Sequence, residues 1–289
     1  MRKWGRRIAI GLASLIGLII LLVVGANIAS ASRQRAVYEV PPSGIRAVSD
    51  PASIERGRHL VEAVGKCGEC HGADLGGRAM IESPVMGTLH ASNLTSGRGG
   101  LDSAFTDEDW VRAIRHGVRR DGRSLIFMPA EGFQRFSDAD LASIIAYMRT
   151  IPPVDRETPE QRIGPLARVL HLAVGLPLLP AELVNHTARP AVPAPAVSIE
   201  YGEYLAVTGG CTGCHGPQLA GSGAGGPNIT SGRLGAWTEA DFMHALREGK
   251  RPDGTPISEA MPWKAAGKMT DDEIRAAWMY VRSLPPVAP

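Results

Sequence analysis

Two stretches of identical spacing, CGECH at residues 67–71 and CTGCH at 211–215, determine how this chain is interpreted. They hold all four of its cysteines, and a histidine follows each pair at once. The residues concerned are Cys67, Cys70 and His71 in the first stretch and Cys211, Cys214 and His215 in the second. Paired cysteines in an exported chain often form disulfides, but a histidine after both pairs is no part of that pattern.

The spacing Cys-x-x-Cys-His is typical of covalent haem attachment. Two thiols at this distance reach the two vinyl groups of one porphyrin, and the adjacent histidine supplies a nitrogen ligand to the iron. A zinc site would need two further ligands at regular spacing in each half of the chain, and a thioredoxin-like pair would lie in a βαβ pattern. Neither pattern occurs, so the motifs predict two covalently attached haem c groups.

An internal repeat surrounds the two motifs. NLTSGR at 93–98 recurs as NITSGR at 228–233, and both halves close with Pro-Pro-Val, at 152–154 and at 285–287. No alternating strand pattern is evident, so the predicted fold is all-α: two tandem cytochrome c domains, each of three main helices around a haem, behind an N-terminal transmembrane helix. The predicted units are an anchor (1–31), domain 1 (50–154), a strap that is apolar and then Pro-rich (155–196), and domain 2 (197–289).

Capping signals place the three helices of each domain. Their predicted first residues, in domain 1 and then domain 2, are Ser53 and Ser198, Thr106 and Thr238, and Ser137 and Thr270. The first helix is expected to run into the cysteine motif. The second is expected to stop at Gly117 or Gly249, because glycine favours helix ends. The third should bury one apolar face before the proline pair ends it.

The second axial ligand of each iron is predicted from the repeat. Met128-Pro129 and Met261-Pro262 occupy equivalent places before the third helix, and the proline holds the loop extended so that the sulfur is presented. The competing residues are Met80, Met86 and His90, which have no counterparts in domain 2. Histidine–methionine ligation by His71 with Met128 and by His215 with Met261 is therefore predicted.

Supporting residues recur as well. The Asn-x-Thr stretches at 93–95 and 228–230 could bind haem propionates or could shape their loops. Aromatic residues at matching positions could contact the porphyrin or form the hydrophobic core: Phe105 and Trp237, Trp110 and Phe242, and Tyr147 and Tyr280. In so small a domain the two roles coincide.

The N-terminus predicts a membrane anchor. Arg2, Lys3, Arg6 and Arg7 precede an uncharged run at 8–28, which is long enough to span a bilayer. This places the chain in a bacterial inner membrane as a single-pass protein with its haem domains in the periplasm. The alternative is a signal peptide cleaved after Ala29-Ser30-Ala31. The net charge of +2 does not indicate nucleic-acid binding.

The strap is apolar from 166 to 183 but is interrupted by Pro177 and Pro180, so it is too short to span a membrane. We expect it to pack across the two domains; the alternative is a second contact with the membrane. The stretch from Pro190 to Pro195 is predicted to be a stiff spacer.

At these residues the sequence resembles the multihaem cytochrome c subunit of membrane-bound alcohol, sorbitol and gluconate dehydrogenases. The resemblance is carried by Asn228–Thr230, by AMPW at 260–263 and by LPPV at 284–287, and it extends over both domains and the strap. It implies redox partners in the membrane. Members of that group commonly carry three haem motifs and a C-terminal anchor, whereas this chain has two motifs and an apolar run at its N-terminus.

The expected function is electron transfer: single electrons pass from a periplasmic dehydrogenase or other donor, through the two haems, to a soluble cytochrome or a terminal oxidase. We expect no catalysis by the chain itself, because two axial ligands leave no open position on either iron. A haem enzyme of the peroxidase or thiosulfate-oxidising type is one alternative, although no cysteine is spare. A fixed cytochrome subunit of a dehydrogenase or oxidase complex is the other.

Overall fold

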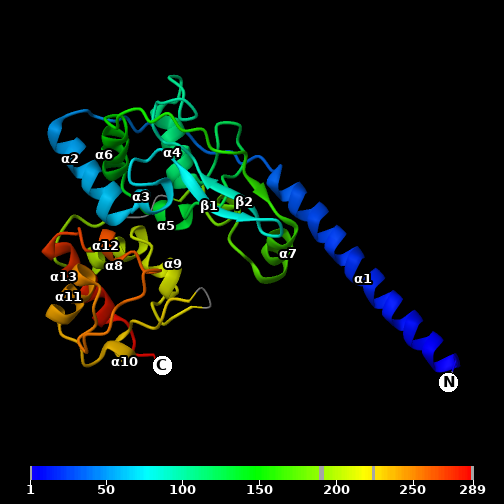
Figure 1. Cartoon of the computed structure of the whole chain (residues 1–289). Helices are drawn as coiled ribbons and strands as arrows, with labels where there is room; N and C mark the ends of the chain where they lie inside the picture. Colours follow the sequence, from blue (N-terminus) through cyan, green and yellow to red (C-terminus); the bar gives the residue numbers. More distant parts are fainter. Residues whose placement is uncertain (1, 189–191, 223–224, 288–289) are drawn as a thin grey trace.

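Two pairs of crossing helices organise the haem domains. In domain 1, α2 (Pro51–His59) crosses α6 (Asp138–Met148), and in domain 2, α8 (Ile199–Thr208) crosses α13 (Asp271–Ser283). At each crossing stands a glycine, Gly57 or Gly202, where a Cβ would overlap a backbone carbonyl oxygen of the opposite helix. The repeat therefore conserves the close approach of two helices. The computed structural model describes residues 2–188, 192–222 and 225–287 (Figure 1).

The remaining helices follow the predicted capping signals. Thr106 and Thr238 begin α4 (Asp107–His116) and α11 (Glu239–Glu248) with complete capping boxes, and Gly117 and Gly249 end them in the left-handed conformation. Thr270 forms a capping box at α13, and Ser137 accepts the Asp140 N–H at α6. Short helices α5 (Ala130–Phe133) and α12 (Trp263–Ala266) follow the Met-Pro pairs, and α10 (Ser231–Leu234) follows the second Asn-x-Thr.

The first helix of domain 1 differs from the prediction at both ends. Asp50, not Ser53, caps α2, because its carboxylate accepts the N–H groups of Ala52 and Ser53. The helix then passes into a π-helical turn, η1 (Leu60–Val64), and stops before the cysteine motif. Cys67 follows Gly57 by ten residues, whereas Cys211 follows Gly202 by nine. The wider turn absorbs the extra residue, as single insertions in helices often require. In domain 2, Ser198 caps α8 as predicted.

A small antiparallel sheet corrects the expectation that no strands occur. It pairs β1 (Arg78–Ser83) with β2 (Gly87–Ala91), and β2 with the two-residue β3 (Arg162–Ile163) of the strap. The hairpin occupies the stretch of domain 1 that has no counterpart in domain 2. Its pairing with β3 joins residues far apart in the sequence, which a local pattern does not reveal.

The strap packs on domain 1 rather than across both domains. Its helix α7 (Pro165–Val174) lies against α1 (Arg2–Gln34), and its 3₁₀ turn η2 (Pro180–Glu182) lies near α5. Residues from the strap and from β2 form a separate small core. That core consists of Leu89, Ile163, Ala167, Leu178 and Leu179. In the predicted spacer, Pro190 and Ala191 lie outside the described residues, as do the last two residues of the chain.

A polar interface joins the domains. Arg56 of α2 forms ion pairs with Asp140 (3.0 Å) and, across the interface, with Glu273 (3.3 Å). Its guanidinium also donates to the hydroxyl of Tyr201 at 3.3 Å. Nε2 of His59 lies 2.6 Å from the Glu273 carboxylate. Because every one of these groups has a partner, the interface holds the domains in one relative position.

Candidate haem sites

Each cysteine motif forms one short helix with the same entry and exit. Cys67–His71 is α3 and Cys211–His215 is α9. A left-handed residue precedes each helix, Lys66 at φ 53° and Gly210 at φ 74°, and a glycine at φ 83° follows each. The helical turn places the two thiols and the histidine of a motif on one side, as covalent attachment of one porphyrin requires.

Both motif histidines are held by a backbone carbonyl. Nδ1 of His71 lies 2.7 Å from the carbonyl oxygen of Ser92, and Nδ1 of His215 lies 2.7 Å from that of Pro227. A carbonyl oxygen only accepts hydrogen bonds, so Nδ1 carries the proton and Nε2 presents a lone pair. Burial lowers the pKa of His71, which favours this neutral form. The carbonyl contact thus orients each ring as a metal-binding histidine requires.

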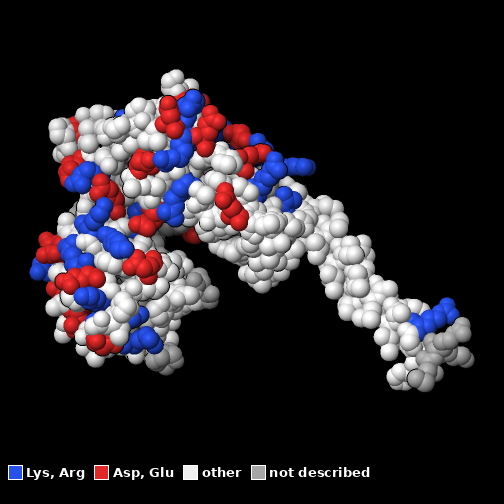
Figure 2. Space-filling model, in the orientation of Figure 1, with Lys and Arg blue, Asp and Glu red and all other residues white. Residues whose placement is uncertain are grey.

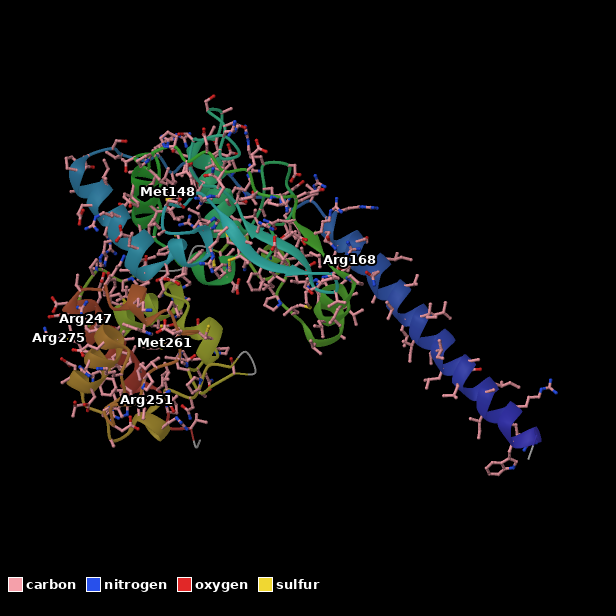
Figure 3. All side chains as sticks on the ribbon, viewed as in Figure 1. Met148, Arg168, Arg247, Arg251, Met261 and Arg275 are labelled. Carbon is pink, nitrogen blue, oxygen red and sulfur yellow. The ribbon has the colours of Figure 1, made fainter. Side chains whose placement is uncertain are left out.

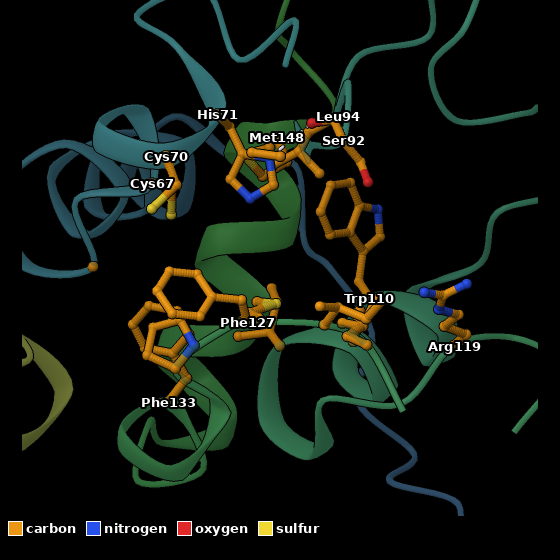
Figure 4. Close-up of a pocket in the computed structure, with 18 of the residues that line it drawn as sticks. Cys67, Cys70, His71, Ser92, Leu94, Trp110, Arg119, Phe127, Phe133 and Met148 are labelled. Carbon is orange, nitrogen blue, oxygen red and sulfur yellow. Dashed lines mark hydrogen bonds between the residues drawn. The ribbon is translucent and has the colours of Figure 1, made fainter. Parts of the chain in front are cut away.

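A cavity of about 480 Å³ occupies the centre of domain 1 and contains the predicted site. Cys67, Cys70, His71 and Met128 all line it. In Figure 4 the thiols enter from one side and the His71 ring from above, while Trp110 and Arg119 stand at the opposite edge from the thiols. Most of the wall is apolar. It includes Leu60, Leu94, Phe105, Trp110, Ile114, Phe133, Phe136 and Ile144.

The two methionine loops have the same local geometry. The N–H of Ala130 donates to the Met128 carbonyl at 2.8 Å, and the N–H of Trp263 donates to the Met261 carbonyl at 2.7 Å. The proline between them has φ −79° and ψ 54° in domain 1 and φ −77° and ψ 54° in domain 2. These values describe an inverse γ-turn centred on the proline. The equivalence predicted for Met128 and Met261 therefore extends to their backbone.

The competing residues of domain 1 divide into two groups. Met80 and His90, from the hairpin, line the same cavity as Met128. Met86 packs instead against the small core of the strap. His90 is buried, and its Nε2 lies 3.3 Å from the Glu82 carboxylate. The hairpin has no equivalent in domain 2, so neither residue shares the repeated geometry of the Met-Pro loops.

The Asn-x-Thr stretches shape and tie down their loops. The side-chain oxygen of Asn93 accepts the N–H and hydroxyl of Thr95, and its amide donates to the Val154 carbonyl at 2.7 Å. Asn228 makes the same bonds to Thr230 and to Val287. The repeated Pro-Pro-Val thus closes onto the repeated Asn-x-Thr. Because these polar atoms already have protein partners, the loop-shaping role is the one that the structure supports.

The thiols do not form the alternatives to haem attachment. No disulfide joins any of the four cysteines, all of which lie in the described part of the chain. Among the described residues, no three His, Cys, Asp or Glu side chains gather as a metal site would need. Burial, and then the neighbouring Cys70, raises the pKa of Cys67 to about 12, so its thiol is protonated at neutral pH before any group is attached.

An unpaired donor at the cavity edge tests the fit of a haem further. Nε of Arg119 is buried and has no hydrogen-bond partner among the described residues. Such an atom costs stability unless a ligand group accepts its hydrogen. A haem has carboxylates on the side away from its vinyl groups, and Arg119 stands opposite the thiols (Figure 4). The thiols, the imidazole, the apolar wall and this cation therefore fit a haem c.

Domain 2 presents the same groups in a more open setting. His215 is buried, Cys211 packs against a core that contains Trp278 and Tyr280, and Met261 packs against the larger core shared by both domains. Arg251, the counterpart of Arg119, donates to the Thr255 hydroxyl and the Pro256 carbonyl of its own loop. Figure 3 shows Met261 toward domain 1 and Arg251 farther from it.

Lys66 links the two motifs across the interface. Its Nζ donates to the Val64 carbonyl at 2.9 Å and to the carbonyl of Gly209, two residues before Cys211. Burial lowers its pKa, while the nearby Cys211 and Cys67 thiols act in the opposite direction. The two haem-attachment helices thus meet at one side chain. Sequence analysis missed this contact and the two carbonyls that hold the histidines, because each depends on residues brought together only by folding.

One family model matches both halves of the repeat. The family model described as cytochrome c oxidase, cbb3-type, subunit III matches residues 52–148 and 199–281. The chain is 29% identical over 279 residues to the cytochrome c subunit of a quinone alcohol dehydrogenase from Gluconacetobacter polyoxogenes, covering 83% of this chain and 58% of that protein. It is 29% identical over 296 residues to the fructose dehydrogenase cytochrome subunit of Gluconobacter japonicus, covering 92% and 58%.

A third relative is closer in length. The chain is 27% identical over 267 residues to a "diheme cytochrome c-type" protein of Cereibacter sphaeroides, covering 80% of this chain and 86% of that one. By contrast, the chain spans less than two thirds of the dehydrogenase subunits, 58% of each. These matches confirm the resemblance that the motifs indicate.

Proposed function

The chain belongs to the family described as cytochrome c oxidase, cbb3-type, subunit III, and from this membership we propose that it is a membrane-anchored carrier of single electrons. Its two cytochrome c domains each carry one covalently bound haem c. When bound, a haem c supplies an iron that accepts and releases one electron. Two of the relatives named above are cytochrome subunits, and the same role is assigned here rather than catalysis.

We assign the first haem to Cys67, Cys70, His71 and Met128, and the second to Cys211, Cys214, His215 and Met261. The single observation that carries this assignment is the gathering of the first four residues around one apolar cavity. His71 is oriented through Nδ1, Met128 is presented by the proline turn, and Trp110 and Phe133 exclude water. A water-free site with both axial ligands in place favours electron transfer over bond chemistry, because its side chains need not rearrange when the iron changes charge.

The proposed electron path crosses the domain interface. Lys66 holds the two attachment helices together through Gly209, and the ion pairs of Arg56 keep the domains in one orientation. A fixed, short separation between the attachment sites favours transfer between the haems. Electrons would then enter through one domain and leave through the other.

The proposed donor is a membrane-bound dehydrogenase, and the proposed acceptor is a soluble cytochrome or a terminal oxidase. Support for the donor comes from the names of the relatives, which are subunits of alcohol and fructose dehydrogenases. A fixed subunit of such a complex and a mobile carrier differ only in their affinity for the dehydrogenase. We favour the fixed subunit because these relatives are named as subunits.

The proposed anchor is α1, with both haem domains on the periplasmic side of the inner membrane. Among the described residues it is the one helix that is long and apolar enough to cross a membrane, and its apolar segment has no protein cover. An alkaline wash of membranes tests the anchor. The full chain should sediment with the membranes, whereas release into the supernatant would contradict a span.

Removal of each methionine tests the ligand assignment. We expect the reduced wild-type protein to bind no carbon monoxide, and Met128→Ala and Met261→Ala each to bind it at one haem. Met80→Leu is the matched control, because Met80 lines the cavity of domain 1 but is not assigned as a ligand. An unchanged sixth ligand in either alanine variant would show the assignment for that domain to be wrong.

Purification of the tagged full chain from native membranes tests the partner. A dehydrogenase that copurifies in a fixed ratio and reduces both haems when given its substrate would support a permanent subunit. A chain that purifies alone, and is reduced no faster by any membrane dehydrogenase than by a soluble donor, would contradict it.

A further inference from the structure

Helix α7 of the strap turns an apolar face outward. Its buried face contains Ala167 and His171, which are 1% and 7% exposed. On the opposite side, Leu166 is 44% exposed, and Ala173, seven residues later on the same face, is exposed as well. Val174, the last residue of the helix, is 72% exposed at the border of the buried face. Leu183, farther along the strap, is 48% exposed. Isolated apolar residues are common on protein surfaces, but an entire apolar helix face usually indicates a contact.

The strap is fastened to the outer end of α1. The two helices α1 and α7 pack against each other, and Arg33 in the last turn of α1 forms a bidentate ion pair with Glu182. His171 of α7 lies 3.5 Å from the same carboxylate. These contacts fix the outward face of α7 beside α1. They lie where the apolar segment of α1 ends and domain 1 begins.

The surface of this region is continuous and uncharged. In Figure 2 charged side chains are spread over both haem domains, whereas α7 and the long span of α1 form one white surface. Basic and acidic side chains both stand above this white surface in Figure 2. Arg33 lies in the last turn of α1 and Arg162 in β3. Arg168 lies beside α1 in Figure 3, and its Nε donates to the Ile163 carbonyl at 2.9 Å.

We infer that α7 docks on the lipid bilayer as a second membrane contact, with Leu166 and Val174 among the outer headgroups and acyl chains. The inference rests on the proposed membrane span of α1. The occupant is lipid because the apolar face continues the surface of α1 and lies where that helix leaves the membrane. An amphipathic helix in the interface, with cationic residues at its margin, is the arrangement that lipids favour. Together α1 and α7 fix the orientation of domain 1 and leave domain 2 projecting toward soluble partners.

Chemical accessibility of position 174 tests the inference in the full-length holoprotein. A cysteine is introduced by Val174→Cys, and by Val48→Cys as the matched control, since Val48 is 60% exposed just before domain 1 and lies outside the strap. The four native cysteines do not react because they are bound to haem. Each variant is placed in vesicles of phosphatidylcholine and phosphatidylglycerol and treated with a water-soluble maleimide. Each rate is divided by that of the same variant after denaturation.

We expect labelling at 174 to be at least about tenfold slower than at 48, because the interface excludes the charged reagent. Leu166→Glu, combined with Val174→Cys, should restore rapid labelling while the protein stays in the vesicle fraction. Equal rates at 174 and 48 in protein that sediments with the vesicles would overturn the α7 contact alone. Protein that does not sediment would overturn the α1 span, and the α7 inference with it.

Discussion

The two methionine loops share one backbone geometry and differ in what surrounds them. In domain 1 the loop is held by segments from outside the repeat. Tyr38 N–H donates to the Gly122 carbonyl at 2.8 Å, Phe127 N–H donates to the Leu178 carbonyl at 2.9 Å, and Ala181 N–H donates to the Ser124 hydroxyl at 3.2 Å. The segment after α1 and the strap thus clamp the Met128 loop from both sides.

In domain 2 the corresponding loop depends on itself. Arg251 N–H donates to the Thr255 carbonyl at 2.8 Å and Gly254 N–H donates to the Arg251 carbonyl, and the equivalent residues of domain 1 form the same two bonds. What differs is that the domain 2 loop is exposed from 250 to 256. The difference teaches that local sequence sets the shape of a ligand loop, while distant segments set its resistance to opening. We therefore expect Met261 to be the more readily displaced ligand, and the second haem to be the one that partners approach.

Two glycines provide the strongest test of this comparison. Gly122 and Gly254 have φ of 82° and 80°, but a Cβ on Gly122 would lie 2.7 Å from Val37, whereas one on Gly254 would have no described neighbour within 4 Å. Both alanine variants incur strain of about 1–2 kcal/mol. Gly122→Ala should cost up to about 1 kcal/mol more, because it also displaces the exposed side chain of Val37.

The measurement is thermal loss of the near-infrared band of the methionine–iron bond in each variant. Gly122→Ala should lower the temperature at which the Met128 ligand is lost, until it resembles the Met261 ligand. Equal effects of the two substitutions would mean that the clamp contributes nothing.

The arginines at the loop entrances give the next largest difference. Arg119 has a buried, unpaired Nε at the cavity of domain 1, while Arg251 is satisfied by its own loop. A cation beside a haem favours its reduced, less positive state, so Arg119→Leu should lower the midpoint potential of the first haem. We expect a fall on the order of 59 mV, a tenfold change for one electron. Arg251→Leu is the control, with little change at either haem.

Spectroscopic redox titration of the two haems measures this effect. Arg119→Lys should restore part of the potential, because it returns the charge without the fixed guanidinium geometry. If the first haem has the same potential in Arg119→Leu as in the wild type, Arg119 does not interact with the haem.

The features shared by the domains are those that sequence could predict. The capping boxes at Thr106 and Thr238 were predicted because a cap involves residues three apart. The equivalence of Met128 and Met261 follows from the Met-Pro dipeptide repeated at matching places in the two halves. Two cytochrome domains around duplicated motifs were predicted for the same reason. Local rules are sufficient where the contacts are local.

The features that distinguish the domains depend on distant contacts, and sequence did not reveal them. Pairing of β2 with Arg162–Ile163 joins the hairpin to the strap. The π-helical turn at Leu60–Val64 follows from one inserted residue between two fixed points, Gly57 and Cys67. The clamp on Met128 and the meeting of the motifs at Lys66 both bring together residues from separate elements. No periodicity records such contacts, because their geometry arises only when the whole chain has packed.

Acid should weaken the contact between the two domains by protonating the carboxylate of Glu273. Burial disfavours the charged form of Glu273, but the hydrogen bond from His59, the Thr270 N–H and the Arg56 charge outweigh it and hold its pKa below the ordinary 4.5. A lowered pKa stabilises the fold above 4.5, and that contribution is lost as the pH falls through the lower folded-state value. Domain contact should therefore weaken in acid.

Glu273→Gln should cost about 1–3 kcal/mol near neutral pH, since it removes a charged partner from His59 and Arg56. The control is Glu62→Gln, whose partner Lys268 crosses the same interface at 3.2 Å but is 57% exposed. That exposed pair should contribute less than about 1 kcal/mol. Urea unfolding in neutral and acid buffer measures both, and an equal loss of stability from the two substitutions would contradict the assignment.

The smallest expected difference lies at the residue before each cysteine helix. Lys66 and Gly210 adopt the same left-handed backbone, at φ 53° and 74°, but only glycine does so without strain. Lys66→Ala keeps the strain and loses the bond to Gly209, whereas Lys66→Gly loses the bond and relieves the strain. The glycine variant should therefore be more stable than the alanine variant by about 1 kcal/mol.

Gly210→Ala in domain 2 should cost a similar amount, and urea unfolding of the three holoproteins measures all of these values. If Lys66→Gly is no more stable than Lys66→Ala, the left-handed turn carries no cost in domain 1. Relief of backbone strain would then not account for the glycine that domain 2 has at this position.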